Sequence, residues 1–382
     1  MSDESNAPQT PLQQTVLHSE HKALGGRLVP FAGYEMPVQY AGVVKEHQAV
    51  RTAAGLFDVC HMGELVLSGE YAAQVVDYLV TNDCSRLQDG QALYTCCCNE
   101  DGKVLDDLIV YKAARDRFLI VCNASNREKI VGVFKKAAEN HCDFEDVSDK
   151  TALLALQGPK AFEILARCGG DGPSLSQLRP FSFTDGVLCN VRATVARTGY
   201  TGEDGVEIFC DLADAPSLWR QLLEIGREFG IEPCGLACRD TLRLEARLSL
   251  YGNEIDETTN PLEAGLGWVV KFEKEMFVGK EALKAVKEAG LTRKLVGFEV
   301  TGKGIARHGY PLQDKDGNVV GICTSGSPAP TLSKNIGLGY LPAALAEVGT
   351  EFFVDCRGKA IAAIVVKTPF YKRSKKKKKM ST

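Results

Sequence analysis

The clearest pattern in the first half of the chain is a series of short apolar runs separated by turn residues. Three such runs, joined by Asn-Glu-Asp-Gly and by Ala-Ala-Arg-Asp-Arg, lie at 91–98, 103–112 and 118–123. Runs of this length with turn chemistry at the joins predict a three-strand antiparallel meander. A helical pattern follows at 125–140, and Ser125 or Asn126 is its expected N-terminal cap.

A similar mixture of elements recurs further along the chain. Helical patterns lie at 46–57, ending near Gly55, and at 159–168 and 215–230, and strand patterns lie at 151–157, 186–197 and 206–212. Because hairpins alternate with crossovers, this mixture predicts α+β layers rather than a purely parallel sheet. After about residue 290 the helical spacing stops, and short strands with Gly and Pro turns predict a small β-barrel or sandwich.

The expected fold class is therefore α+β, with two α+β units followed by an all-β module. A chain of 382 residues is long enough for two or three domains. We expect four parts: a discontinuous first α+β domain over 1–50 and 150–260, a second over 51–149, a C-terminal β-barrel domain over 290–373, and a basic tail over 374–382.

Composition and charge narrow the possible functions. Hydrophobic residues make up 45% of the chain and charged residues 25%, as in ordinary soluble domains, and no apolar run approaches the length of a membrane span. The net charge is −4, but residues 372–379 carry seven positive charges, so the rest of the chain carries −11. An acidic body argues against nucleic acid as a partner, and the Lys run is expected to be a solvated tail.

The fourteen cysteines indicate neither a disulfide framework nor a metal site. The chain has no C-x-x-C pair, its six His are scattered, and many cysteines lie inside apolar runs. We therefore expect free, buried thiols in a reducing compartment and no metal. The opening residues MSDES are acidic, unlike an Arg-rich mitochondrial presequence.

Two adjacent carboxylates, Asp106 and Asp107, interrupt an otherwise apolar strand. Successive strand side chains point to opposite faces, so at least one carboxylate points where water is scarce. In one interpretation the strand is an edge, with one Asp in solvent and the other capping a backbone amide. In the other, a carboxylate in a partly apolar cavity receives or orients a proton. The residues alone slightly favour the first interpretation.

The segment RTGYTGEDGVEIF at 197–209 groups acidic residues and a tyrosine around glycines. Glu207 alternates with Val206 and Ile208, so its carboxylate points away from both and is able to take two N–H donors from a planar heterocycle. The acidic residues argue against a phosphate loop, and the chain contains no Walker, G-x-G-x-x-G, G-x-S-x-G or H-E-x-x-H motif.

A third candidate lies in the predicted helix that begins near residue 235. Arg239 and Arg243 are four residues apart and share one face. For Arg243 with Glu245 or Arg247 we expect a surface ion-pair stripe. Arg239 lies beside cysteines and an apolar run, so we expect a buried or ligand-facing guanidinium.

Several ordered segments together resemble a known family. They are FAGYEMPVQY, LFDVCHMGEL, GKVLDDLIVY, LLALQGP, RTGYTGEDGVEI, CRDTLRLEARLSLYGNEID, CTSGSPAPTLSKNIGLGYL and KTPFYKR. From about residue 12 to 373 the chain resembles the aminomethyltransferase, or T-protein, of the glycine cleavage system. The resemblance implies a three-domain cloverleaf with folate in a central channel. It also implies transfer of an aminomethyl group from the lipoyl arm of a carrier protein, with release of ammonia and formation of 5,10-methylenetetrahydrofolate.

The resemblance also assigns roles to residues. Asp107 matches the catalytic carboxylate, with Asp106 as its structural neighbour. Tetrahydrofolate is implied as co-substrate, and the residues that match its contacts are Met62, Tyr94, Val121, Asn123, Tyr200, Glu207, Arg239 and, less closely, Tyr371 and Arg373. Among them, Glu207 matches the carboxylate that holds the pterin N–H groups. Some members of the family have Trp at the position of Tyr34, and this difference affects none of the roles assigned above.

The resemblance also bears on the cellular location and leaves two alternative functions open. The family is mitochondrial in eukaryotes, and a bacterial member is expected in the cytoplasm. Two related folate folds remain as alternatives: an oxygen-independent demethylase, and a non-catalytic assembly factor for iron–sulfur proteins. The assembly factors carry K-G-C-Y-x-G-Q-E, where this chain has TGYTGEDG, and Asp107 with Tyr200 and Glu207 favours the enzyme.

Overall fold

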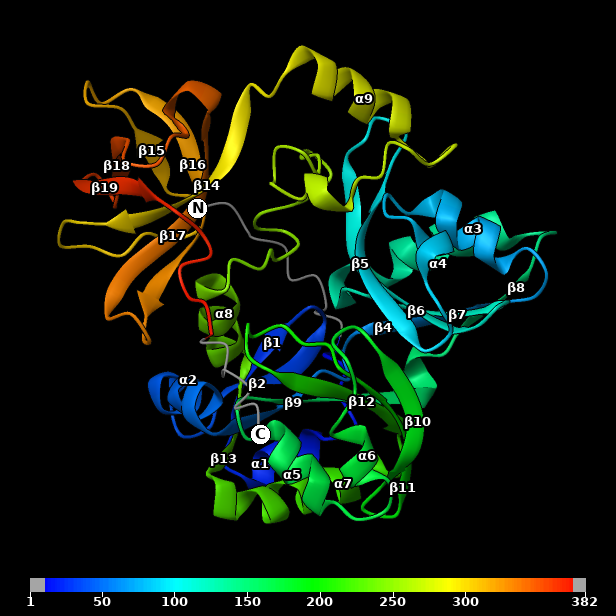
Figure 1. Cartoon of the computed structure of the whole chain (residues 1–382). Coiled ribbons are helices and arrows are strands. Elements are labelled where there is room, and N and C mark those ends of the chain that lie inside the picture. The colour runs from blue at the N-terminus through cyan, green and yellow to red at the C-terminus, as the bar shows by residue number, and fades with distance from the viewer. Residues whose placement is uncertain (1–10, 374–382) are drawn as a thin grey trace, which may run out of the picture.

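A computed structural model describes residues 11–373, which form three lobes around a common centre (Figure 1). The first lobe contains a sheet in the order β10-β11-β12-β9-β3-β13. Its strands are β3 (Ala54–Asp58), β9 (Thr151–Gln157), β10 (Phe183–Leu188), β11 (Val191–Ala196), β12 (Gly205–Asp211) and β13 (Ile231–Pro233). Helices α1 (His18–Ala23), α5 (Ala161–Arg167), α6 (Gly172–Leu175) and α7 (Ala215–Gly226) accompany it, and Trp219 of α7 is fully buried in the core of this lobe.

The second lobe is built on a five-stranded antiparallel sheet in the order β5-β6-β7-β4-β8. The strands are β4 (Gly63–Ser68), β5 (Gln91–Cys98), β6 (Val104–Ala114), β7 (Arg117–Cys122) and β8 (Asp143–Asp146). Helices α3 (Ala72–Leu79) and α4 (Arg127–Ala138) pack on one face, because one residue in two along each strand is apolar and joins their core. The predicted meander is confirmed as β5, β6 and β7.

The third lobe is a closed six-stranded barrel, as the all-β pattern predicted. Its strands are β14 (Arg293–Val300), β15 (Pro311–Gln313), β16 (Val319–Ala329), β17 (Lys334–Pro342), β18 (Glu351–Asp355) and β19 (Ala360–Val366). Helix α9 (Lys280–Ala289) precedes it in the chain. Together with the two mixed lobes, the barrel confirms the predicted fold class.

Three elements bring the lobes together. The hairpin of β1 (Arg27–Phe31) and β2 (Tyr34–Gln39) and helix α8 (Leu236–Glu245) lie towards the centre in Figure 1, and helix α2 (Val43–Thr52) contacts α8. Helix α8 contacts β2, α2 and the barrel strand β16. The lobes are therefore packed together at α8. Among the described helices, none has the length and apolar character that a membrane crossing requires.

Two local predictions were wrong. The helix expected to end near Gly55 ends at Thr52, and Gly55 lies in β3, where a Cβ atom would stand 2.4 Å from a methyl carbon of Val50. The strand expected over 186–197 is instead the hairpin β10–β11, which turns at Cys189 and Asn190, both with positive φ. The helix end is set by close packing at Gly55, and the hairpin is set by the positive φ of Cys189 and Asn190. The hydrophobic pattern shows neither feature.

The domain ranges stay a prediction, and one feature of the sheet bears on them. Strand β3 pairs with β9 and β13 in the first lobe, whereas the expected boundary at residue 51 assigns these residues to the second domain. The expected basic tail over 374–382 lies outside the described residues.

Candidate functional site

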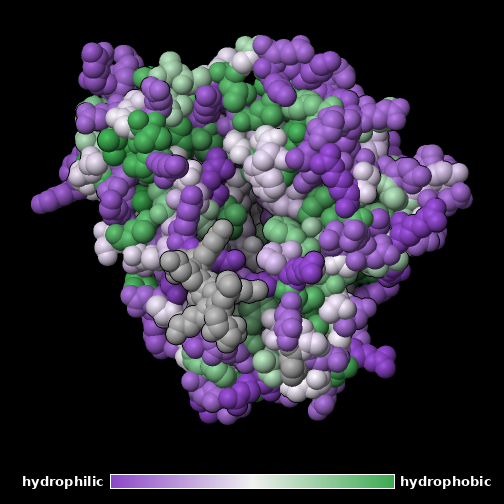
Figure 2. All heavy atoms as spheres, viewed as in Figure 1, coloured by the Kyte–Doolittle hydropathy of each residue, from purple (hydrophilic) through white to green (hydrophobic). Residues whose placement is uncertain are grey.

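The face of the five-stranded sheet that points away from α3 and α4 carries most of the candidate residues. Register places Tyr94 opposite Ile109 and Ile109 opposite Val121, in one row across the sheet. Asp107 lies on the same face, two residues before Ile109. Tyr111 and Val121 share a core cluster with Phe57, Leu153 and Phe209 of the first lobe, so this face meets the six-stranded sheet. Figure 2 shows the surface hollowed where the lobes meet.

Asp106 and Asp107 are held in different ways. Asp106 is fully buried and accepts hydrogen bonds from the backbone N–H of Asn123 at 2.9 Å, from Asn123 Nδ2 at 2.8 Å and from Asn126 Nδ2 at 2.6 Å. Asp107 accepts from Tyr94 Oη at 2.9 Å and from Asn123 Nδ2 at 2.8 Å. Its carboxylate therefore keeps acceptor capacity for a further partner.

The structure corrects one expectation about this pair. Strand β6 lies between β5 and β7, so the interpretation as an edge strand with one Asp in solvent is wrong. Asn126 is the N-cap residue of α4, as predicted, but its side chain makes no capping bond, and its amide Nδ2 donates to Asp106. Both carboxylates are thus set inside the sheet by Asn side chains from the turn after β7.

Burial changes the proton affinity of both carboxyls. Loss of water raises the pKa of Asp107 to about 6, against the opposing effect of the hydrogen bonds from Tyr94 and Asn123. Burial and the neighbouring charge of Asp107 raise the pKa of Asp106 to about 7. A carboxylate that holds a proton near neutral pH is suited to proton transfer.

Glu207, on β12, faces this region from the first lobe. Its carboxylate accepts a very short hydrogen bond from the Thr198 hydroxyl and a long one, at 3.4 Å, from Tyr111 Oη. Tyr111 is thus a bridge between the two sheets that the sequence analysis missed. The available signal was its position four residues after Asp107, on the same strand face.

Tyr200 and Arg239 form the other side of this region. The Tyr200 hydroxyl donates to the Ser249 carbonyl at 2.5 Å, and the Arg239 guanidinium lies 4.6 Å from the centre of the Tyr200 ring. The Nη1 atom of Arg239 is buried and has no hydrogen-bond partner among the described residues. Burial lowers the pKa of Arg239. The unpartnered Nη1 donor agrees with the expectation that the Arg239 guanidinium faces a ligand.

The expected surface stripe at Arg243 is wrong. Arg243 is fully buried, and its Nη1 donates to Glu254 Oε2 at 2.6 Å and its Nη2 to Ser325 Oγ at 2.7 Å. Glu245 is buried too and accepts from Arg51 Nη2 at 2.9 Å. The barrel and the loop after α8 cover this face of the helix, so charges that look exposed in sequence are interior.

The remaining candidates lie around the same region or at its edge. Met62 packs against the core cluster that includes Val121. The Tyr371 backbone N–H donates to the Glu245 carbonyl at 2.8 Å, and Arg373 forms an ion pair with Asp204. The C-terminal candidates therefore contact α8 and the loop before β12.

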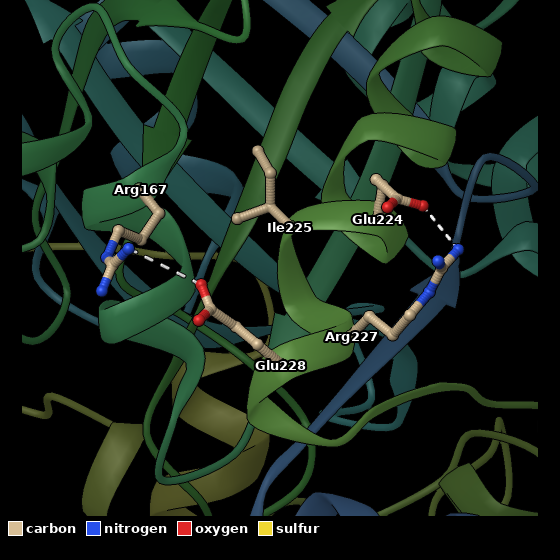
Figure 3. Close-up of a pocket in the computed structure, with 5 residues that line it drawn as sticks. All are labelled: Arg167, Glu224, Ile225, Arg227 and Glu228. Carbon is tan, nitrogen blue, oxygen red and sulfur yellow. Dashed lines mark hydrogen bonds and ion pairs between the residues drawn. The ribbon is translucent and has the colours of Figure 1, made fainter.

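A separate surface hollow of about 520 Å³ lies beside α5 and α7 (Figure 3). Its charged side chains pair with each other, Arg167 with Glu228 at 3.6 Å and Arg227 with Glu224 at 2.5 Å. They are 59–77% exposed, and no predicted site residue lines this hollow. Solvated ion pairs of this kind indicate a surface feature rather than a reaction site.

All fourteen cysteines are free thiols, and twelve of them are buried. The thiol sulfurs of Cys234 and Cys238 and a carboxylate oxygen of Glu46 lie within 4.8 Å of one another, as the ligands of a metal ion would. Glu46 already accepts backbone N–H groups of Tyr40, Gly42 and Gly235 at 2.6, 3.0 and 2.9 Å. Its carboxylate is therefore committed to holding the chain around α2, which argues against a metal there.

Family models cover nearly the whole described chain. The model described as the GCVT N-terminal domain matches residues 17–274, and the one described as the glycine cleavage T-protein C-terminal barrel domain matches residues 293–372. The chain belongs to the glycine cleavage T-protein family. It is accordingly an enzyme of the aminomethyltransferase class, and neither alternative folate function is favoured.

Relatives agree with this assignment over their full length. The chain is 49% identical to the aminomethyltransferase of Desulfitobacterium hafniense strain DCB-2, covering 95% of this chain and 99% of the relative. It is 49% identical to that of Geobacillus thermodenitrificans, covering 95% and 100%. The crystal structure of glycine cleavage system aminomethyltransferase T from Bartonella henselae matches with a TM-score of 0.88 at 36% identity, covering 94% of this chain and 98% of that one. These relatives are bacterial and give no support to a mitochondrial location.

Proposed function

We propose that this chain moves the carbon of an aminomethyl group from the lipoyl arm of a carrier protein to tetrahydrofolate, with release of ammonia and formation of 5,10-methylenetetrahydrofolate. The observation that carries the proposal is the half-satisfied Asp107 carboxylate, which is held by Tyr94 and Asn123 on the sheet face that meets the first lobe. The family supports tetrahydrofolate as the co-substrate.

The residues around Asp107 suit a flat heterocycle that carries both donors and acceptors. Glu207 offers a carboxylate to ring N–H groups, and the unpartnered Nη1 of Arg239 offers a donor to a ring acceptor. Met62 and Val121 supply an apolar wall. A buried donor without a partner costs roughly 1 to 3 kcal/mol, so a ligand that takes its hydrogen bond recovers that cost.

When bound, tetrahydrofolate supplies nucleophilic ring and side-chain nitrogens. We assign Asp107 the task of orienting these nitrogens and accepting a proton from them as the new bond to carbon forms. Its negative charge also favours positive charge that develops as ammonia leaves, and the low exposure of the site strengthens that attraction. Tyr94 and Asn123 fix the carboxylate, so little reorganisation is needed at the moment of reaction.

The carrier is proposed as the protein partner, and its arm needs a route to Asp107. Trp268, which is 60% exposed, stacks on Tyr94 with ring centres 5.8 Å apart. Because Tyr94 donates to Asp107, continuous contacts lead from the surface to the carboxylate. This arrangement supports entry of the arm beside Trp268. The bacterial relatives support a cytoplasmic location.

A reconstituted assay tests the proposal. Aminomethylated carrier and tetrahydrofolate are incubated with and without the protein, and methylenetetrahydrofolate and ammonia are measured together. Both products should form in equal amounts and only with protein present. Tetrahydrofolate alone should raise the melting temperature of the protein as its concentration increases. Failure of both measurements would exclude this function.

A further inference from the structure

The buried residue Glu64 lies in the same sheet row as two predicted folate contacts. Register pairs Glu64 of β4 with Val121 of β7, which pairs with Ile109 of β6, which pairs with Tyr94 of β5. Residues directly opposite each other in antiparallel strands share a face. Glu64 therefore points to the side of the sheet that carries Asp107, away from the core around α3 and α4.

The Glu64 carboxyl has none of the partners that buried acids normally have. Its side chain is fully buried, and neither oxygen has a hydrogen-bond partner among the described residues. Arg127, whose charge favours an ionised Glu64, is engaged with Asp146 at 2.9 Å and with Asp149 at 2.7 Å. Burial raises the pKa of Glu64 well above its usual range. The charge of Arg127 opposes this rise, and the charges of Asp146, Asp149 and Glu207 add to it. A buried carboxyl without a hydrogen-bond partner favours its neutral form, in which one oxygen carries a proton that it can donate.

We propose that Glu64 is a further substrate-binding residue, which donates a hydrogen bond to the ring carbonyl of the folate beside the N–H groups taken by Glu207. The inference rests on the proposed function. In a pterin ring the carbonyl is adjacent to a ring N–H, so a carboxylate that takes the N–H leaves the neighbouring acceptor in need of a donor. An ionised carboxylate would repel that oxygen, whereas a neutral carboxylic acid donates to it. Glu64 and Glu207 are then a matched pair, one protonated and one ionised.

Two variants at this position separate donation from packing. Glu64→Leu keeps the approximate size but removes the donor, and Glu64→Gln keeps a donor in its amide. Affinity for tetrahydrofolate, measured by calorimetry, should fall about tenfold in Glu64→Leu and stay within about threefold in Glu64→Gln. Without ligand, Glu64→Leu should melt no lower than the wild type, because it removes a buried polar group that has no partner.

A 4-amino analogue of the folate ring provides the matched ligand, because its amino group presents a donor where the natural ring presents an acceptor. The wild type should prefer the natural ring, and Glu64→Leu should narrow that preference, because the variant lacks the donor that serves the ring carbonyl. Unchanged folate affinity in Glu64→Leu, or equal losses for both ligands, would overturn the role of Glu64 while leaving the proposed function intact. If the wild type binds no folate at all, the proposed function fails as well.

Discussion

Two arginines one helical turn apart on α8 differ in their surroundings, since Arg243 is fully buried and Arg239 is half-buried. Arg243 donates to Glu254 and Ser325, so its charge is matched within the protein. Arg239 lies against the Tyr200 ring and keeps a buried Nη1 without a partner. The same contrast separates Asp106, which is bound by Asn123 and Asn126, from the less occupied Asp107.

We infer that this contrast distinguishes charges that are matched within the protein from charges that are left for a ligand. A buried charge is costly unless it is paired, so a protein that leaves one incompletely paired requires a compensating interaction. Arg243 lies where α8 meets the barrel and Asp106 lies inside the five-stranded sheet, whereas Asp107 lies on the sheet face that meets the first lobe. Hydrogen-bond satisfaction therefore distinguishes Asp107 and Arg239 from their neighbours Asp106 and Arg243.

The largest effect is expected from breaking the satisfied pair. Arg243→Leu leaves Glu254 buried without its cation, so the free energy of unfolding should fall by roughly 3 to 5 kcal/mol in urea denaturation. The double variant Arg243→Leu with Glu254→Leu should recover part of the loss, because no buried charge remains unpaired and Asp240, which also pairs with Arg243, is 46% exposed. A loss below about 1 kcal/mol in the single variant would show that this pair does not hold the lobes.

Asp107→Asn tests the incompletely paired member of the carboxylate pair. The swap preserves size but removes the ability to take a proton, so the turnover number should fall roughly 100-fold or more, with a smaller change in folate affinity. Asp106→Asn is the matched control and should mainly reduce stability. Loss of turnover in the Asp106 variant with retention in the Asp107 variant would reverse the assignment of the two residues.

Glu207→Ala sharpens the comparison on the ligand side. Removing the carboxylate should weaken folate binding by roughly 1.5 to 3 kcal/mol, the range for hydrogen bonds to a charged group. Glu299→Ala, which removes a barrel carboxylate paired with the exposed Lys334, is the control and should leave binding unchanged. Equal affinities in the wild type and the Glu207 variant would remove Glu207 from the site.

The smallest effect is a change in how stability depends on pH. Because burial raises the pKa of Asp107 from 3.8 to about 6, the folded chain binds this proton more tightly than the unfolded chain does. The associated stability is fully present below pH 3.8 and is lost as the pH rises through about 6. Asp107→Asn stays neutral, so its melting temperature should fall less than that of the wild type between about pH 4 and about pH 8. If the melting temperatures of the wild type and the variant change equally with pH, the raised pKa of Asp107 is contradicted.

Local patterns predicted much of this molecule. Alternation and turn chemistry identified the meander, and the change of pattern near residue 290 identified the barrel. The adjacent Asp106 and Asp107 marked an unusual strand, but choosing between them required the family resemblance, and their roles stay predictions. Partners distant in sequence were not predictable. Arg243 meets Ser325 of the barrel, and nothing in the amphipathic pattern of α8 shows that another lobe covers this face.

The place of β3 has a consequence for synthesis on the ribosome. All five of its residues are buried in the finished sheet, and Asp58 pairs with Leu154 of β9, which emerges only after the whole five-stranded lobe has been made. At about 5 to 20 residues per second, β3 waits roughly 5 to 20 seconds for this neighbour. We expect the inserted lobe to fold first during this interval, while the apolar β3 segment needs shielding from other nascent chains.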